Sequence, residues 1–283
     1  MIKLEDVSYV YMQGGPFEKT AIHNVSLEIK KGEFIGLIGH TGSGKSTLIQ
    51  LLNGLLKPTS GKIIIDGKDL SQKDTDIQKI RFQVGLVMQY PEYQLFEETV
   101  AKDIAFGPTN MGLSKEEVKE RVEFAANMVG LSPELLEKSP FDLSGGQKRR
   151  AAIAGVLAME PKVLILDEPT AGLDPAGRDE ILYKIKDMHA RMGVTVILVS
   201  HSMEDVAKLA DRILVMNQGQ VEMFDKTAEV FRHGERLTQI GLNVPQITRV
   251  MDGLKKQGVP VGEGVYTIEE AYHQLLGLMG LKE

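Results

Sequence analysis

The sequence contains no cysteine, and this absence excludes several kinds of site at once. Disulfide bonds, thiolate metal ligands and cysteine nucleophiles are all ruled out. A chain without cysteine also suits a reducing compartment such as the cytoplasm. Any catalytic or metal site in this protein must therefore be built without thiols.

Long hydrophobic runs are missing as well. The longest purely aliphatic stretches, such as Val163–Leu166 and Val196–Val199, are short, whereas a membrane-spanning helix needs about 20 mostly apolar residues. Residues 1–11 contain no charged segment followed by an apolar one, so we expect no signal peptide. If the protein works at a membrane, other chains must cross it.

The chain also lacks an excess of positive charge. Its 33 Lys and Arg residues against 39 Asp and Glu residues give a net charge of −6. Nucleic-acid binding needs a basic face that neutralises phosphates, so we expect no nucleic-acid partner. A hydrophobic content of 42% over 283 residues is enough for a core. This length predicts one large domain with an appended segment, or two domains.

Hydrophobic periodicity indicates an α/β fold. Apolar residues at every second position in Ile2–Leu4 and Val25–Ile29 predict half-buried antiparallel strands near the N-terminus. Later apolar runs alternate with helical patterns, which predicts a parallel sheet covered on both faces. These runs are Val163–Leu166, Val194–Val199 and Ile213–Met216.

A helical insert and a helical appendage complete the predicted organisation. Ser114 and Glu117 form the pattern of a capping box, Ser132-Pro133 opens a second helix, and Lys148–Met159 reads as a third. Amphipathic spacing predicts more helices after residue 230. We therefore predict a domain over residues 1–230 with a helical insert at about 90–160, and a small helical appendage over 231–283.

A glycine-rich loop lies between the apolar strand Phe34–Ile38 and a helix predicted over Thr47–Leu52. It matches the phosphate-binding pattern G-x-x-x-x-G-K-S/T, and this context argues against a chance glycine-rich turn. In such a loop, backbone N–H groups and the helix N-terminus hold the phosphates of a nucleotide. Lys45 reaches the β- and γ-phosphates, and Ser46 offers a hydroxyl to Mg²⁺. The residues assigned to ATP binding here are Gly39, His40, Thr41, Gly42, Ser43, Gly44, Lys45, Ser46 and Thr47.

Two acids, Asp167 and Glu168, follow the apolar run Val163–Leu166. A carboxylate at the C-terminal end of a parallel strand points into the crevice where ligands bind. Asp167 is placed to hold Mg²⁺ and Glu168 to polarise the attacking water. On their own these acids fit a turn that caps a core strand equally well, but the phosphate-binding loop favours the catalytic interpretation.

A third motif is the pentapeptide Leu143–Gln147, in which Ser144 is the expected cap of a helix with free N–H groups for an anion. With the other two motifs, it makes the chain closely similar to ABC ATPases over about residues 1–225. The resemblance implies a P-loop NTPase fold with a parallel sheet, an N-terminal antiparallel subdomain and an inserted helical subdomain. It also implies that Ser144, Gly145, Gly146 and Gln147 of one subunit close over ATP bound to another.

The same resemblance assigns roles to four further residues. Tyr11 matches the aromatic residue that stacks on adenine, although a core strand aromatic is the alternative. Gln89 matches the glutamine that senses Mg²⁺ and the γ-phosphate, with a solvated loop amide as the alternative. His201 matches the histidine that contacts the γ-phosphate, with a structural histidine at a strand end as the alternative. Asp174 matches the loop that meets the opposite subunit. Ala171 in that loop replaces a serine that is frequent in the family.

Within this family, several segments are similar to ATPases of energy-coupling factor transporters, and most to their second, A-prime ATPase. The segments are Tyr11–Glu18, Gln89–Phe96, Phe106–Pro108 and Lys148–Gly155. This implies a peripheral protein on the cytoplasmic face of the membrane that uses ATP and Mg²⁺ to power import of vitamins or transition-metal ions. The implied partners are a second ABC ATPase subunit, a transmembrane coupling protein and a substrate-capture membrane protein.

We expect the loop from Gln89 to Thr99 to dock on the coupling protein, because it carries Glu92, Glu97 and Glu98 among the exposed-looking aromatics Tyr90, Tyr93 and Phe96. The alternative is that these acids only form a solvated face. Three other functions compete. The ATPase of a conventional ABC importer or exporter would share every catalytic motif. A non-transport ABC protein would carry two cassettes or a long coiled coil, and this chain has neither. A regulatory module without turnover is disfavoured by Glu168 and His201.

Overall fold

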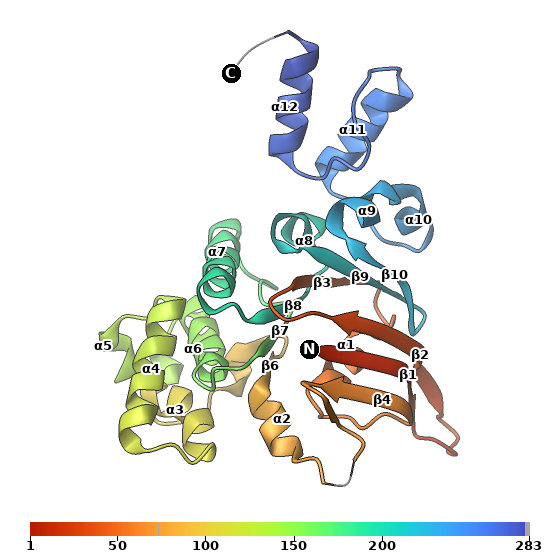
Figure 1. The fold of residues 1–283 in the computed structure, drawn as a ribbon. Coiled ribbons are helices and arrows are strands. Elements are labelled where there is room, and N and C mark those ends of the chain that lie inside the picture. Colours follow the sequence, from red (N-terminus) through yellow and green to blue (C-terminus); the bar gives the residue numbers. More distant parts are fainter. Residues whose placement is uncertain (73, 281–283) are drawn as a thin grey trace.

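The computed structural model describes residues 1–72 and 74–280 and is built on two β-sheets (Figure 1). The first is a four-stranded antiparallel sheet in the order β2-β1-β4-β5. The pairs Ile2 with Ile29 and Leu4 with Leu27 confirm the predicted N-terminal antiparallel strands. The strands are β1 (Ile2–Tyr11), β2 (Lys19–Ile29), β4 (Ser60–Ile65) and β5 (Lys68–Asp69).

The second sheet has six strands in the order β10-β9-β3-β8-β7-β6. Its parallel part confirms the predicted P-loop NTPase core. The antiparallel edge strand β10 was not predicted, because its mixed polar and apolar residues are mostly half-buried and give no clear alternation. The strands are β3 (Phe34–Ile38), β6 (Val84–Val87), β7 (Val163–Asp167), β8 (Thr195–Val199), β9 (Arg212–Asn217) and β10 (Gln220–Lys226).

Helix α1 (Lys45–Leu52) lies between the two sheets and joins them in one hydrophobic cluster. In β7, Val163 and Ile165 belong to this cluster, whereas Leu164 and Leu166 pack among the helices on the other face. This alternation follows from the two-residue period of a strand. Helix α1 begins two residues before the predicted Thr47, so the lysine and serine of the glycine-rich loop form its first turn.

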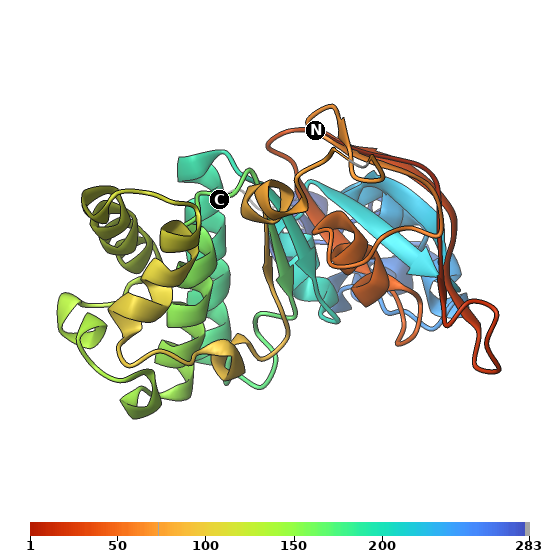
Figure 2. The same cartoon turned by 90° about the horizontal axis from the view of Figure 1, so that it is seen from below.

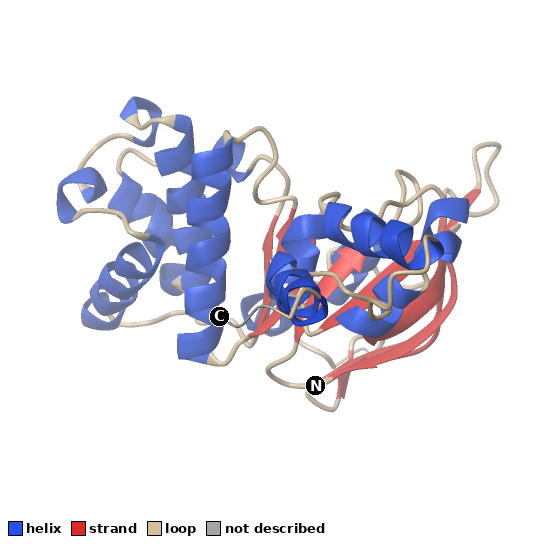
Figure 3. Ribbon diagram, turned by 90° about the horizontal axis from the view of Figure 1, so that it is seen from above, coloured by secondary structure: helices blue, strands red, loops and turns tan. Residues whose placement is uncertain are grey.

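The predicted helical insert is present and lies to one side of both sheets (Figures 2 and 3). Ser114 and Glu117 form the predicted capping box, and Ser144 with Gln147 forms another. Ser144 is the helix cap that the pentapeptide predicted, so α6 begins at Gly145, three residues before Lys148, where the third helix of the insert was expected to begin. The insert contains η1 (Pro91–Gln94), α3 (Val100–Asn110), α4 (Lys115–Val129), α5 (Pro133–Leu136), η2 (Pro140–Asp142) and α6 (Gly145–Leu157).

The remaining helices pack against the parallel sheet or extend beyond it. Helix α2 (Ile77–Gln83) precedes β6, and α7 (Pro175–Met192) and α8 (Met203–Leu209) follow β7 and β8. In the part of the chain that the structure describes, no helix combines the length and the apolar character needed to cross a membrane.

The C-terminal segment contains helices of two kinds. Val230 and Phe231 of α9 and Leu237 of α10 share a hydrophobic cluster with Ile38 and Ile213 of the parallel sheet. Helices α11 and α12 share a separate small cluster and stand away from the core (Figure 1). The predicted boundary at residue 230 stays a prediction. The helices are α9 (Thr227–Arg232), α10 (Gly234–Gln239), α11 (Gln246–Lys256) and α12 (Ile268–Leu278).

Candidate functional site

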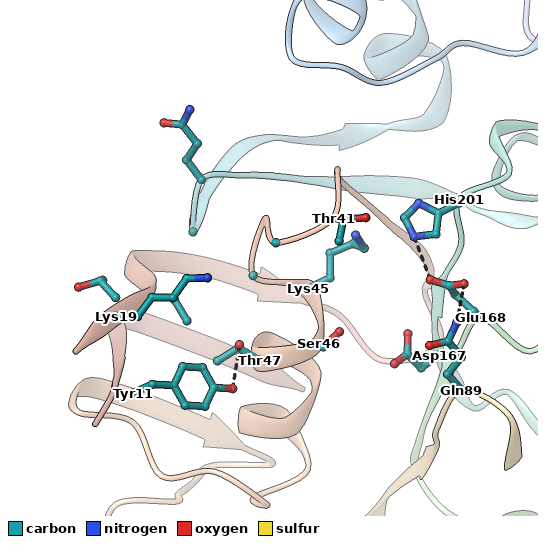
Figure 4. Close-up of a pocket in the computed structure, with 16 residues that line it drawn as sticks. Tyr11, Lys19, Thr41, Lys45, Ser46, Thr47, Gln89, Asp167, Glu168 and His201 are labelled. Carbon is teal, nitrogen blue, oxygen red and sulfur yellow. Dashed lines mark hydrogen bonds and ion pairs between the residues drawn. The ribbon is translucent and has the colours of Figure 1, made fainter. Parts of the chain in front are cut away.

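A cavity of about 730 Å³ opens beside the first turn of α1 and the carboxyl end of β7 (Figure 4). This volume lies within the range of small-molecule binding sites. The cavity brings together most of the residues predicted to bind ATP and to hydrolyse it. It is lined by Tyr11, Lys19, Thr20, Ala21, Thr41, Gly42, Gly44, Lys45, Ser46, Thr47, Gln89, Asp167, Glu168, His201, Gln218 and Gly219.

The glycine-rich loop has the tight curvature that phosphate binding requires. Gly44, at the start of α1, has φ +103°, a backbone conformation that residues other than glycine rarely adopt. A Cβ on Gly39 would lie 2.4 Å from the buried Ser43 hydroxyl, so these two residues form the packed underside of the loop. His40 is half-buried, and its Nε2 lies 3.2 Å from Oδ1 of Asn217. The N–H of Gly219 donates to the Ser43 carbonyl over 3.0 Å and fixes the loop to the β9–β10 turn. The loop therefore presents a helix N-terminus to the cavity, where an anion is favoured.

Lys45 places its amine at this same end of the cavity (Figure 4). The Nζ donates to the carbonyl oxygens of Gly39 over 2.6 Å and His40 over 3.1 Å. Burial lowers the pKa of this amine, and the nearby carboxyl groups of Glu168 and Asp167 act in the opposite direction. A phosphate oxygen that replaced these carbonyls would satisfy the same donors and add charge attraction.

The two adjacent acids at the end of β7 have different surroundings. Burial raises the pKa of Asp167, Glu168 raises it further, and Lys45 and His201 lower it. Glu168 has a backbone φ of 49°, a region that is unusual for a residue other than glycine and that is found at functional sites. Its Oε1 lies 2.9 Å from Nε2 of His201, and its Oε2 accepts from Nε2 of Gln89 over 3.1 Å. Both oxygens of Glu168 are thus held by predicted catalytic residues.

The expected Mg²⁺ can be tested against the donors in the cavity. Ser46, Gln89 and Asp167 all line it and supply a hydroxyl, an amide and a carboxylate oxygen. Within residues 1–72 and 74–280, no group of three or more His, Asp or Glu side chains is arranged to hold a metal by itself. Mg²⁺ prefers oxygen ligands and usually takes one or two carboxylates together with waters and substrate phosphates. The donor set therefore fits Mg²⁺ that arrives with a nucleotide.

Tyr11 lines the end of the cavity opposite Glu168 (Figure 4). Its hydroxyl lies 3.2 Å from the Thr47 hydroxyl, and its ring meets Tyr9 edge to face with centroids 4.8 Å apart. The side chain is 37% exposed, so the ring belongs to the cavity wall and not to the core. Stacking on a base stays a prediction.

Five residues of the cavity wall were missed by the sequence analysis. Lys19, Thr20 and Ala21 are there because β1 and β2 form a hairpin in which Tyr11 pairs with Lys19. Gln218 and Gly219 form the β9–β10 turn, with φ values of 48° and 79°. The segments on both sides of residues 12–18 alternate between apolar and polar residues, which indicates a β-hairpin. That pattern could have predicted Lys19, Thr20 and Ala21 beside Tyr11.

The predicted signature residues and Asp174 do not line this cavity. Ser144, Gly145, Gly146 and Gln147 lie at the start of α6, and Asp174 caps α7 by accepting from the Gly177 N–H over 2.7 Å. Apart from its chain neighbours and the backbone of its own helix, a Cβ added to Gly145 or Gly146 would meet no atom of the described residues within 4 Å. The packing of this chain therefore gives no reason for glycine at either position.

The loop after Gln89 corrects one expectation. Glu92 is not an exposed acid: it forms an ion pair of 2.8 Å with Arg149, whose side chain is 3% exposed. Charge reversal at Glu92 would break this buried pair and would not report on docking. The exposed aromatics expected in this loop are confirmed, since Tyr90, Tyr93 and Phe96 are all exposed. Phe96 and Phe106 line a groove of about 270 Å³ on the helical insert.

Comparison with known proteins identifies relatives over almost the whole chain. A model of the ABC transporter family matches residues 22–171. The energy-coupling factor transporter ATP-binding protein EcfA2 of Caldanaerobacter subterraneus is 61% identical over 275 residues, 97% of this chain and 96% of the relative. Its counterpart from Clostridium tetani is 60% identical over 282 residues, 99% of this chain and 98% of the relative.

Two solved structures share the fold. One is cbiO1 from Clostridium perfringens, described as part of the ABC transporter complex cbiONQ, with a TM-score of 0.75 and 41% identity, covering 89% of this chain and 98% of that one. The other is the dimeric ATP-binding cassette MJ0796 bound to ADP and Pi, with a TM-score of 0.71 and 32% identity. The match covers 80% of this chain and 98% of that one.

Proposed function

Since this chain belongs to the ABC transporter family, and within it to the energy-coupling factor transporter ATP-binding proteins, we propose that it binds and hydrolyses ATP to power such a transporter. The observation that carries the proposal is the cavity that combines the phosphate-binding loop with Glu168 held by Gln89 and His201. The transported substrates are proposed to be vitamins or transition-metal ions.

ATP lies along the cavity in this proposal, with its base at Tyr11 and its phosphates at the loop. The aromatic ring of Tyr11 stacks on the base and the Lys19 side chain lies beside it. The N–H groups of residues 39–46 hold the phosphates, and the Lys45 amine moves from the loop carbonyls to the β- and γ-phosphate oxygens. The separation of Tyr11 from Glu168 in Figure 4 supports this direction of binding.

Hydrolysis depends on Glu168. Its carboxylate orients a water for attack on the γ-phosphorus and accepts the proton that this water loses. His201 and Gln89 hold the carboxylate at its two oxygens and also contact the γ-phosphate. Ser46, Asp167 and Gln89 would hold Mg²⁺, which, when bound, neutralises charge on the β- and γ-phosphates.

A second ABC ATPase subunit completes the site. The first turn of α6 offers Ser144, Gly145, Gly146 and Gln147 to ATP bound by the partner, and Asp174 lies in the loop that meets that partner. Open space beside Gly145 and Gly146 supports a contact with a second molecule at this turn. ATP then joins the two subunits, and its hydrolysis separates them.

The partners in the membrane are a transmembrane coupling protein and a substrate-capture protein, so this chain lies on the cytoplasmic face. The groove beside Phe96 and Phe106, with exposed Tyr93, is suited to an amphipathic helix end of the coupling protein. A conventional ABC importer or exporter would use the same catalytic residues. Similarity to energy-coupling factor proteins over 97% of this chain favours assignment to an energy-coupling factor transporter.

Purification of the chain from its native membranes tests this proposal. We expect a second, similar ATPase and a membrane coupling protein to be recovered with it, and the complex to hydrolyse ATP. Lys45→Ala should abolish productive ATP binding and turnover, because no neighbouring side chain replaces the amine. Recovery with the subunits of a conventional importer, or full turnover by Lys45→Ala, would contradict the assignment.

A further inference from the structure

Arg149 is a buried cation that contacts two separate loops. It lies on α6, and its side chain is 3% exposed. Its Nε and Nη2 donate to the two carboxylate oxygens of Glu92, on η1, over 3.2 and 2.8 Å. Its Nη1 donates to the carbonyl oxygens of Pro169 over 3.1 Å and Ala171 over 2.8 Å. One guanidinium thus joins the loop after Gln89 to the loop after Asp167.

Both of these loops also meet at Glu168. Pro169 is the residue that follows Glu168, and Gln89 at the start of the other loop donates to Oε2 of Glu168. The loop containing residues 168–174 ends at Asp174, the cap of α7. A displacement of η1 therefore reaches Glu168 by two routes, through the Gln89 side chain and through the guanidinium of Arg149.

We propose that Arg149 is a positioning residue for hydrolysis, which transmits the position of the loop 89–99 to the backbone that carries Glu168. This inference rests on the proposed function, in which the loop 89–99 docks on the membrane coupling protein. Docking shifts η1, Glu92 carries the shift to Arg149, and Arg149 moves the carbonyls of Pro169 and Ala171. Glu168 then reaches the position for attack only when the membrane partner is engaged.

The residue type supports this role. The guanidinium is planar and has five N–H donors in a fixed fork. Two of its nitrogens, Nε and Nη2, can therefore bind a carboxylate while the third, Nη1, binds backbone carbonyls. The ammonium of lysine is a point charge on a flexible stem and cannot span both loops. A buried ion pair is also a poor way to gain stability, since apolar residues of the same volume do as well or better.

The test uses Arg149→Lys, Glu92→Gln and the double variant in the complex purified from membranes, with kcat, KM for ATP and Tm measured for each. We expect kcat at least about fivefold lower in each single variant, as for a coupling free energy of ordinary size. KM for ATP should stay within about twofold, because neither residue lines the nucleotide cavity in the described chain. The double variant should be no slower than the slower single variant, because both changes break the same linkage.

Arg121→Lys is the matched control. Arg121 also lies in the helical insert and also binds a carboxylate and a carbonyl, Glu160 at 3.1 Å and Ala158 at 3.3 Å. We expect this variant to keep the kcat of the wild type. If Arg149→Lys does not fold, Glu92→Gln alone must show the loss of kcat without a change in KM.

Three results would overturn the inference. The first is a wild-type kcat in Glu92→Gln, and the second is a loss of kcat in Arg121→Lys as large as that in Arg149→Lys. The third is a loss of kcat in the double variant that equals the product of the two single losses. A wild-type complex without ATPase activity would overturn the proposed function together with the inference. Unchanged variants of an active complex would overturn the inference alone.

Discussion

At the scale of single residues, the different contacts of Asp167 and Glu168 support the different roles proposed for them. Glu168 is held at both oxygens by His201 and Gln89, whereas Asp167 is half-buried and lines the cavity wall together with Ser46 and Lys45. These contacts support the proposed roles, in which Glu168 accepts the proton of the attacking water and Asp167 is a ligand of Mg²⁺. Asp167 and Glu168 have different surroundings because Asp167 is the last residue of β7 and Glu168 is the first residue after it.

Tyr11 gives a prediction at the same scale. Tyr11→Ala should weaken ATP binding by roughly 5- to 140-fold, which corresponds to the roughly 1–3 kcal/mol of stacking on a base. The loss should be similar for GTP, because stacking contacts the face of the base. Tyr11→Phe removes only the contact with the Thr47 hydroxyl and should bind almost like the wild type. Equal nucleotide affinity of Tyr11→Ala and the wild type, measured by titration, would exclude stacking.

Most residues of the cavity were predictable because their motifs are short and local. A glycine-rich loop, an acidic strand end and a histidine after a strand each place their residues within a few positions of a strand terminus. Glu92 was misjudged for the opposite reason. Its partner Arg149 is 57 residues away, and no local pattern indicates that the two meet.

At the scale of elements, the helix caps at Ser114 and Ser144 were predicted, whereas the edge strand β10 was not. Capping boxes at Ser114 and Ser144 are formed by residues three positions apart, so the sequence contains the whole interaction. Strand β10 is stabilised by its pairing with β9 and by side-chain contacts of Gln220 and Glu222 with other segments. One of these contacts fastens β10 to the C-terminal segment, through Glu222 and Arg236 at 2.7 Å.

This ion pair leads to a prediction about pH. Hydrogen bonds from Arg236 and Asn217 hold the pKa of Glu222 below its ordinary value of 4.5. Because the folded-state pKa is lowered, the pair stabilises the protein above pH 4.5, and this contribution is lost as pH falls through the folded-state pKa. Glu222→Gln should therefore lower the free energy of unfolding at pH 7 by up to about 1 kcal/mol, the value of a partly exposed pair.

Urea unfolding at a series of pH values would measure this effect. The difference between wild type and Glu222→Gln should shrink as pH falls below 4.5. Glu229→Gln, which removes an exposed pair with Arg232 inside α9, should have the smaller effect at pH 7. A difference that grows with acidity would contradict the argument.

At the scale of the whole molecule, the two motifs proposed to bind nucleotide lie on different surfaces of the chain. The cavity between the sheets carries the phosphate-binding loop and Glu168, while the first turn of α6 belongs to the helical insert at one side (Figure 2). The sequence contains both motifs but does not indicate that they lie apart in one chain. That separation follows from the position of the insert beside the sheets, and it supports a site completed by a second subunit.

The most direct test of this account is to measure bound nucleotide and the dimer fraction of Glu168→Gln and Asp167→Asn under Mg-ATP. Glu168→Gln keeps the shape of the side chain and removes its charge, so hydrolysis should slow by about 10²–10⁴-fold while ATP binding persists. This variant should accumulate as a closed dimer with ATP trapped, and Asp167→Asn should lose Mg²⁺-dependent binding. Wild-type turnover by Glu168→Gln, or identical behaviour of the two variants, would contradict the account.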